Sequence, residues 1–416
     1  MPDSIPQLVD HLFRHQAGRL VSHLVRSLGP AHVDLAEDVV QDALIAALRR
    51  WPFDGVPDEP AAWLYRVARN RAVDVLRRHQ TLRTKLEVFE SDSTALTDDE
   101  TPARFDDELD DDVLRMIFAC SHPSIPDDAR APLTLKLVCG FDVSEIARAF
   151  LTTETTMAQR IVRAKRRLRA GDIEIEVPGP KAIDERLSSV LDVIYLLFNE
   201  GYAAHQGENL VRADLVDEAI RLGSLIVTRD ATARPEAHAL MSLMLLHGAR
   251  LPARVDDEGR LVLLDDQDRL QWDAPSITMG LRHLELAQAG EELSAFHVQA
   301  AIAACHAIAP SPDATDWPQI LAYYDIMMAR FPSPVVQLNR SVAVAMVHGP
   351  DRGLETIDAI DATALSGYYL LPATRAELLR RAGRTQDAVR AYDAALKLVS
   401  TTPERRFLEK RVEDLS

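Results

Sequence analysis

Hydrophobic and polar positions alternate with the period of an α-helix over most of this chain. In residues 36–51, apolar side chains recur every three or four positions, which places them on one face of a helix. These apolar residues are Ala36, Val39, Val40, Ala43, Leu44, Ala47, Leu48 and Trp51. The pattern predicts one long amphipathic helix, and Pro52 is its expected end because proline cannot continue the backbone hydrogen bonding.

A second amphipathic helix is predicted for residues 61–78, after a proline-rich loop. Its apolar side chains lie on or near one stripe, and they are Trp63, Leu64, Val67, Ala68, Val73 and Leu76. Polar and cationic side chains occupy much of the remaining surface, and they include Arg66, Arg69, Asn70, Arg71, Arg77 and Arg78. Residues 1–80 are therefore predicted to form a small helical domain.

Residues 143–169 have the spacing of a helix-turn-helix motif. A short helix with three inward residues is followed by a threonine-rich turn and a longer helix with four inward residues. The inward residues are Ile146, Ala147 and Phe150, then Met157, Ile161, Ala164 and Leu168. Thr152 or Thr153 is the expected N-cap of the longer helix, because a hydroxyl there accepts a hydrogen bond from a free backbone N–H.

The rest of the chain is predicted to be helical from about residue 184 to residue 416. Near its end, Gly349 and Gly383 lie 34 positions apart, and Tyr324 and Tyr392 lie at twice that spacing. This period, with small residues at Ala388 and Ala395, resembles tetratricopeptide helix pairs over residues 317–400. A chain of 416 residues exceeds the roughly 300 residues that one core supports, so several domains are expected.

Charge is distributed unevenly along the chain, whose formal net charge is −17. Residues 81–112 carry three basic and twelve acidic side chains and few large apolar ones, which predicts a flexible acidic linker. Residues 113–171 carry ten basic and five acidic side chains, most of the basic ones between 160 and 169. The negative net charge of the whole chain therefore conceals one basic segment, residues 113–171. The expected fold is all-α: domains at 1–80 and 113–171 joined by the linker, then a helical, partly tetratricopeptide-like domain at 184–416.

The exposed positions of the helix after the threonine-rich turn suit DNA recognition. Hydroxyl, amide and guanidinium groups near its start can read base edges in a major groove, and these belong to Thr155, Thr156, Gln159 and Arg160. Arg163, Arg166 and Arg167 can neutralise phosphates. The alternative is a merely solvated charged face. We favour DNA binding, because this run follows a helix-turn-helix pattern in an otherwise acidic protein.

These motifs together resemble the extracytoplasmic-function sigma factors of RNA polymerase. AEDVVQDALIAALRRW followed by PAAWLYRVARNRAVDVLRR resembles their region two, and residues 127–169 resemble their region four. The C-terminal part resembles a subgroup with a tetratricopeptide-like extension. The family resemblance covers about residues 7–80 and 113–170, in the expected order. It implies a transcription initiation factor that binds core polymerase and promoter DNA.

The resemblance also implies roles for individual residues. Asp38, Gln41 and Asp42 would dock on the clamp helices of the polymerase β′ subunit. The next helix and the loop before it would melt and hold the minus-ten element, with Trp63, Arg66, Asn70, Arg71, Arg77 and Arg78 as candidates, although helical position favours a core role for Trp63. The helix at 153–169 would bind the minus-thirty-five element. Ala158 stands where many members have lysine, so the resemblance leaves the minus-thirty-five sequence undefined.

Other chemistry is not expected from this sequence. Cys120, Cys139 and Cys305 are far apart and predicted to be buried thiols. Asp265, Asp266, Asp268, Arg269, Trp272 and Asp273 form a polar cluster without a histidine motif, and Asp273 is the expected cap of a following helix. His11, His15 and His23 are expected to be surface or core residues. We therefore predict no catalytic residue, metal or cofactor, and, without an apolar run of about 18 residues or a signal peptide, a cytoplasmic protein.

Three functions are compatible with these patterns. The favoured one is a sigma factor whose extension masks the DNA-binding faces, binds a protein or peptide partner, or strengthens the polymerase interface. A second is a helix-turn-helix regulator that acts without polymerase. A third is a helical-repeat scaffold, or an enzyme, with accessory DNA binding.

Overall fold

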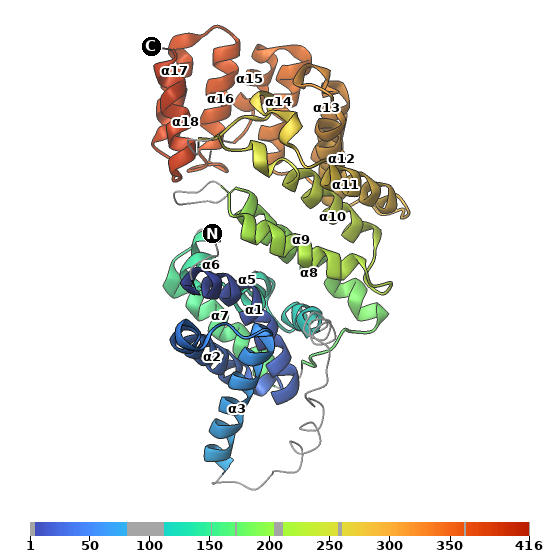
Figure 1. Cartoon of the computed structure of the whole chain (residues 1–416). Coiled ribbons are helices and arrows are strands. Elements are labelled where there is room, and N and C mark those ends of the chain that lie inside the picture. The colour runs from blue at the N-terminus through green and yellow to red at the C-terminus, as the bar shows by residue number, and fades with distance from the viewer. Residues whose placement is uncertain are drawn as a thin grey trace. The chain divides into compact units, whose positions relative to one another are not determined.

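The computed structural model describes residues 5–80, 112–150, 152–170, 173–203, 211–256, 260–361 and 363–415. These residues divide into two compact units, Met1–Leu196 and Leu197–Ser416. Both units consist of helices and short connections, with an isolated antiparallel bridge between Val255 and Leu261 (Figure 1). The expected all-α fold is confirmed for this part of the chain.

The first half of unit 1 contains three mutually packed helices, α1 (Ile5–Leu28), α2 (Val33–Asp54) and α3 (Pro60–Gln80), with a 3-10 turn η1 (Pro30–His32). The apolar stripe predicted for residues 36–51 contributes to the core between them. The buried residues of α2 are Val33, which the prediction did not include, and Ala36, Val39, Val40, Ala43, Leu44, Ala47 and Trp51. Leu48 is an error of the prediction, since it lies on the surface with 42% of its area exposed.

The end of α2 also differs from the prediction. Pro52 lies inside the helix, which continues to Asp54. Proline removes one hydrogen bond and crowds the preceding turn, but α2 ends only two residues later, where the N–H of Gly55 donates to the carbonyl of Trp51 at 3.0 Å. The proline therefore marks the last turn of the helix.

The second half of unit 1 contains a helix over residues 112–120, then α5 (Asp127–Leu137), α6 (Val143–Ala149) and α7 (Glu154–Arg169). Asp112 joins this half to α1. Its carboxylate is fully buried and contacts His23 Nδ1 at 2.6 Å, Arg26 at 3.1 Å and Arg115 at 2.5 Å. A buried carboxylate needs such partners to offset its loss of hydration. The remainder of the predicted linker, 81–111, lies outside the described residues.

Unit 2 begins within a long helix, α8 (Pro180–Tyr202), and continues with α9 (Ala213–Val227) and α10 (Pro235–Gly248). Short 3-10 turns η3 (Leu251–Ala253), η4 (Leu264–Asp266) and η5 (Arg269–Gln271) lead to α11 (Ala274–Ala287) and α12 (Ala295–Ile308). Nine residues of α10 are buried, so this helix has no polar face and packs against α9, α11 and α12.

The last helices of unit 2 pack in sequence order: α13 (Trp317–Arg330), α14 (Pro334–His348), α15 (Pro350–Asp358), α16 (Leu370–Arg381), α17 (Thr385–Leu396) and α18 (Thr402–Glu413). The 34-residue spacing has a structural counterpart. Gly349 and Gly383 end α14 and α16 with φ of 93° and 72°, a conformation that favours glycine. Ala388, Tyr392 and Ala395 are buried in α17.

The cysteines and histidines considered in the sequence analysis differ in how deeply they are buried. Cys120 and Cys139 are buried, and Cys305 is only partly so; all three are free thiols. Burial raises the pKa of Cys120 to about 12, which keeps it protonated. His23 is a core residue, while the side chains of His11 and His15 lie outside the described residues. None of the described helices combines the length and apolar character needed to cross a membrane.

Candidate nucleic-acid interface

Helix α7 has one buried and one exposed face. Met157, Ile161, Ala164 and Leu168 are buried, as their spacing predicts. Thr153 is the N-cap, and its side chain accepts a hydrogen bond from the Thr156 N–H at 3.2 Å. The cap fixes the start of the helix and thereby the direction of its first exposed turn.

The predicted DNA-contacting residues of α7 lie mainly on its exposed face. The exposed ones are Thr155, Thr156, Gln159, Arg163, Arg166 and Arg167. Arg160 differs, because its guanidinium pairs with Asp128 of α5 at 3.2 Å and its side chain is only 23% exposed. The hydroxyl of Thr156 also contacts that of Thr153 at 2.8 Å. The side chains of Arg160 and Thr156 would therefore have to break these contacts before they could bind DNA.

Two further cations of α7 face the start of α2. Lys165 pairs with Glu37 and, at 3.4 Å, with Asp34. Arg169 pairs with the same Asp34. The basic run is thus divided, with Arg163, Arg166 and Arg167 toward solvent and Lys165 and Arg169 toward the first half of the unit. This division could not be derived from helical spacing alone, because it depends on residues 128 or more positions away.

An exposed mixed face lies on α2. Asp38, Gln41 and Asp42 are exposed, as expected. Ile45 and Leu48 follow them one and two turns later and are 44% and 42% exposed. Exposed apolar side chains beside charged ones are typical of protein interfaces. The sequence prediction missed Ile45 and misplaced Leu48, although their spacing from Gln41 shows that they share its face.

An ion pair links this face to α3. Asp42 contacts Arg71 at 2.7 Å, with 57% and 40% of the two side chains exposed. The pair joins one residue predicted to bind polymerase to one predicted to bind DNA. Each is therefore already engaged in the described structure.

The other predicted minus-ten residues belong to α3. Arg66, Asn70, Arg77 and Arg78 are exposed. Trp63 is half-buried and packs edge-on against Trp51, with ring centroids 5.5 Å apart. Phe53, at the end of α2, is 88% exposed. Sequence analysis did not single it out, although it directly follows the proline that marks the helix end.

The polar cluster at 265–273 belongs to unit 2. Asp265 and Asp266 pair with Arg381 and Arg411, Asp268 accepts a hydrogen bond from Leu270 N–H, and Asp273 is the N-cap residue of α11, as expected. The carboxylate of Asp273 accepts a hydrogen bond from the Ser276 hydroxyl. No group of three or more histidine, cysteine or carboxylate side chains suited to a metal occurs among the described residues.

Comparisons with known proteins match three parts of the chain. The model of sigma-70 region 2 matches residues 12–81, and the model of sigma-70 region 4 matches residues 115–168. A family of unknown function (DUF6596) matches residues 186–288. The chain is similar to "Uncharacterized protein R00370" of Rhizobium meliloti (strain 1021), with 42% identity over 391 residues, or 92% of this chain and 91% of that protein. No solved structure matches the chain.

Proposed function

We infer that this chain, which belongs to the extracytoplasmic-function sigma factors and carries a C-terminal extension, uses α2, α3 and α7 to place polymerase at promoters under the control of that extension. The protein directs RNA polymerase core to specific promoters for transcription initiation. Its partners are the core enzyme and promoter DNA. The division of roles among residues is our proposal, as is a cytoplasmic site of action.

The two regions that match sigma-70 region 2 and region 4, residues 12–81 and 115–168, are called the two sigma modules. The observation that carries the proposal is that each module has an exposed face of different character. The face of α2 combines carboxylates with Ile45 and Leu48, and we assign it to the β′ clamp helices. An apolar centre with charged neighbours supports a specific protein contact, because burial supplies affinity and charge fixes the register. The face of α7 is polar and cationic and suits DNA.

We assign the minus-ten element to α3 and the end of α2. Cations at Arg66, Arg77 and Arg78 can follow a phosphate backbone, and Asn70 can hydrogen-bond a base edge. Unpaired bases also need a flat apolar surface for stacking. Trp63 is partly covered by Trp51, so we propose Phe53 as an additional stacking surface.

Replacing Phe53 with alanine should impair promoter melting. Stacking of a base on an aromatic ring contributes roughly 1–3 kcal/mol, so loss of the ring should reduce open complexes by about tenfold. Permanganate reactivity of thymines in the melted region measures this. Val56→Ala, three residues later in the loop that follows α2, is the control and should leave melting unchanged. Equal melting by Phe53→Ala and the unmodified protein would contradict the assignment.

We assign the minus-thirty-five element to α7. Thr155, Thr156, Gln159 and Arg160 would read bases, and Arg163, Arg166 and Arg167 would neutralise phosphates. Lys165 and Arg169 are held by Asp34 and Glu37, so the two sigma modules would have to separate before these cations could reach DNA. We therefore propose that regulation acts on the separation of these modules.

We propose that the extension regulates the sigma modules by binding a partner. Residues 172–416 carry a net charge of −13, and consecutively packed helices form extended surfaces for proteins or peptides. Such a surface can receive a signal by binding a partner.

Run-off transcription with purified core polymerase tests the function and the role of the extension together. Promoters should first be identified with the full chain on genomic fragments. The full chain is then compared with residues 1–179, which retain α7 and end before α8. We expect both to depend on core polymerase, and their activities to differ. Activity without promoter preference would contradict the function, and identical activity under all conditions would contradict regulation by the extension.

A further inference from the structure

A short segment of unit 2, residues 260–266, lies against the last helices of the same unit. We call it the strap. Its first residues pair with residues 254–256: the Val262 N–H donates to the Arg254 carbonyl at 2.9 Å, beside the bridge between Val255 and Leu261. The strap is thus anchored at its start by backbone hydrogen bonds, and its later residues depend on side-chain contacts.

The strap leaves a cavity of about 190 Å³ between itself and the helices. Leu261 and Leu263 line one wall. The other walls come from α14, α16, α17 and α18, with apolar groups that include Val342, Met346, Leu370, Leu378, Phe407 and Leu408. An apolar cavity of roughly 150 Å³ holds a benzene ring. The strap's leucines therefore do not fill the space, and a larger apolar side chain would fit.

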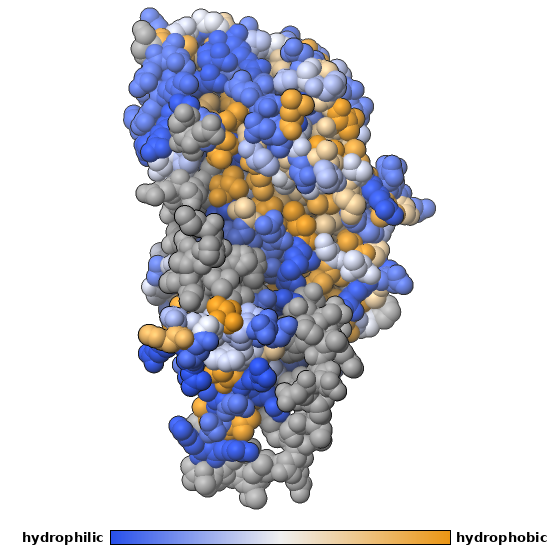
Figure 2. Space-filling view, in the orientation of Figure 1, coloured by the Kyte–Doolittle hydropathy of each residue, from blue (hydrophilic) through white to orange (hydrophobic). Residues whose placement is uncertain are grey.

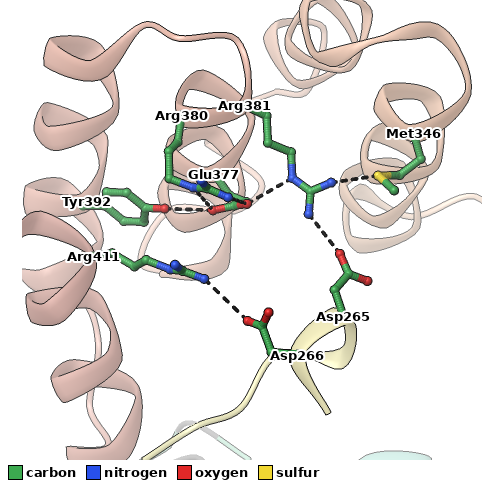
Figure 3. A network of polar contacts seen from close by, with 8 residues as sticks. All are labelled: Asp265, Asp266, Met346, Glu377, Arg380, Arg381, Tyr392 and Arg411. Carbon is green, nitrogen blue, oxygen red and sulfur yellow. Dashed lines mark hydrogen bonds and ion pairs between the residues drawn. The ribbon is translucent and has the colours of Figure 1, made fainter. Parts of the chain in front are cut away.

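Two arginines hold the acidic end of the strap. Asp265 pairs with Arg381 of α16 at 3.0 Å, and Asp266 pairs with Arg411 of α18 at 3.8 Å, as Figure 3 shows. Arg381 also contacts the sulfur of Met346 at 2.9 Å. Arg381 lines the cavity, and the guanidinium of Arg411 lies 5.0 Å from the ring centroid of Phe407, another lining residue, so one ligand could reach both arginines.

Two carboxylates, Glu377 and Glu404, also line the cavity. The hydroxyls of Tyr369 and Thr401 donate to Glu404, and the charge of Glu377 is offset by two arginines. The oxygens of Glu377 accept hydrogen bonds from Arg380 at 2.6 Å and 2.9 Å, from Arg381 at 3.0 Å and from Tyr392 at 3.0 Å. Although burial opposes it, these contacts lower the pKa of Glu377 to about 2. The buried Nε of Arg411 has no hydrogen-bond partner among the described residues.

The acidic end of the strap is weakly held. The side chains of Asp265 and Asp266 are 42% and 64% exposed, and the second ion pair is long. Exposed ion pairs contribute little to stability. In the face drawn in Figure 2, hydrophilic residues cover α16 to α18, and apolar residues gather on the adjoining part of the unit. A competing segment could therefore replace the strap at modest free-energy cost.

We propose that this groove is a peptide-binding site for a partner protein, and that the strap is its built-in competitor. The partner segment presents a bulky side chain, best an aromatic one, two positions before an acidic pair. The bulky group enters the cavity in place of Leu263, and the two carboxylates pair with Arg381 and Arg411. The inference deepens the role proposed for the extension, on which it rests, by naming the chemistry of the partner.

A binding assay on the full chain tests this without polymerase, so its failure is distinguishable from failure of the transcription assay. The probe is a fluorescein-labelled peptide of residues 260–268 with Leu263→Phe. We expect weak binding to the unmodified chain, because the strap occupies the groove. Asp265→Ala/Asp266→Ala should bind about tenfold more tightly, since the apparent affinity rises with the fraction of open sites. Lack of saturable binding to this variant would overturn the proposal.

Two further measurements establish where the peptide binds. Arg381→Gln/Arg411→Gln should lose binding, whereas the matched control Arg352→Gln/Arg390→Gln, with exposed arginines on α15 and α17, should retain it. A probe with asparagine at both acidic positions should bind at least about tenfold more weakly and requires no change in the protein. Equal binding of the two probes would show that the arginines do not recognise the acidic pair and would overturn the assignment.

Discussion

Substitution of Arg163, Arg166 and Arg167 by glutamine should abolish promoter recognition by α7 without unfolding it. All three side chains lie on the exposed face, so the core residues of the helix are unchanged. Three lost phosphate contacts of about 1 kcal/mol each reduce affinity roughly a hundredfold. The slope of log affinity against log salt should fall by about 2.7, because each contact releases close to one counterion.

Salt-dependent binding of the polymerase holoenzyme to promoter DNA measures both effects. Arg352, Arg384 and Arg390 are exposed arginines of unit 2, and their replacement by glutamine removes the same charge elsewhere. This control should retain affinity and salt slope. A similar loss in both triple variants would indicate a general charge effect and refute a specific phosphate contact by α7.

The buried and exposed faces of α7 could be predicted from the sequence because they depend on local helix geometry. Residues 157, 161, 164 and 168 follow the helical period, and Thr153 supplies a cap that needs only its own neighbours. The exposed positions follow by exclusion. Helical spacing and capping chemistry thus define the recognition helix before any tertiary contact is known.

The errors on α2 have a similarly local cause. Leu48 follows Ala47, and consecutive residues are rotated by roughly 100° around a helix. Assigning both to one stripe made that stripe too wide, because apolar character alone does not distinguish a core residue from one in an interface. The misplaced leucine is therefore informative, since it extends the exposed face that begins at Asp38.

Contacts between distant segments could not be predicted at all. Asp34 meets Arg169, and Asp265 meets Arg381, across separations of 135 and 116 residues. No periodicity connects such positions. The carboxylates at 265 and 266 were recognised as a cluster, but their cationic partners and the apolar cavity beside them emerged only from the packing of α14 to α18.

Asp38→Arg should prevent the protein from joining core polymerase. Asp38 is exposed on α2, so the substitution reverses charge on the surface without disturbing the core. If this face meets the β′ clamp helices, a like-charge contact costs several kcal/mol and lowers affinity at least about a hundredfold. Asp42→Arg should act in the same direction but would also break the contact with Arg71, so Asp38 is the cleaner position. Leu48→Ala should weaken binding less, through lost apolar contact.

Fluorescence titration with core polymerase measures the affinity of these variants, and run-off transcription measures the consequence. Glu292→Arg, on an exposed loop between α11 and α12, makes the same change of charge and should leave both readouts intact. The comparison also separates the two DNA-binding hypotheses. A helix-turn-helix regulator that acts without polymerase would tolerate Asp38→Arg, whereas a sigma factor with this face in its core interface loses all promoter-directed activity. Full activity of the Asp38→Arg variant would contradict the assignment of the polymerase interface to this face of α2.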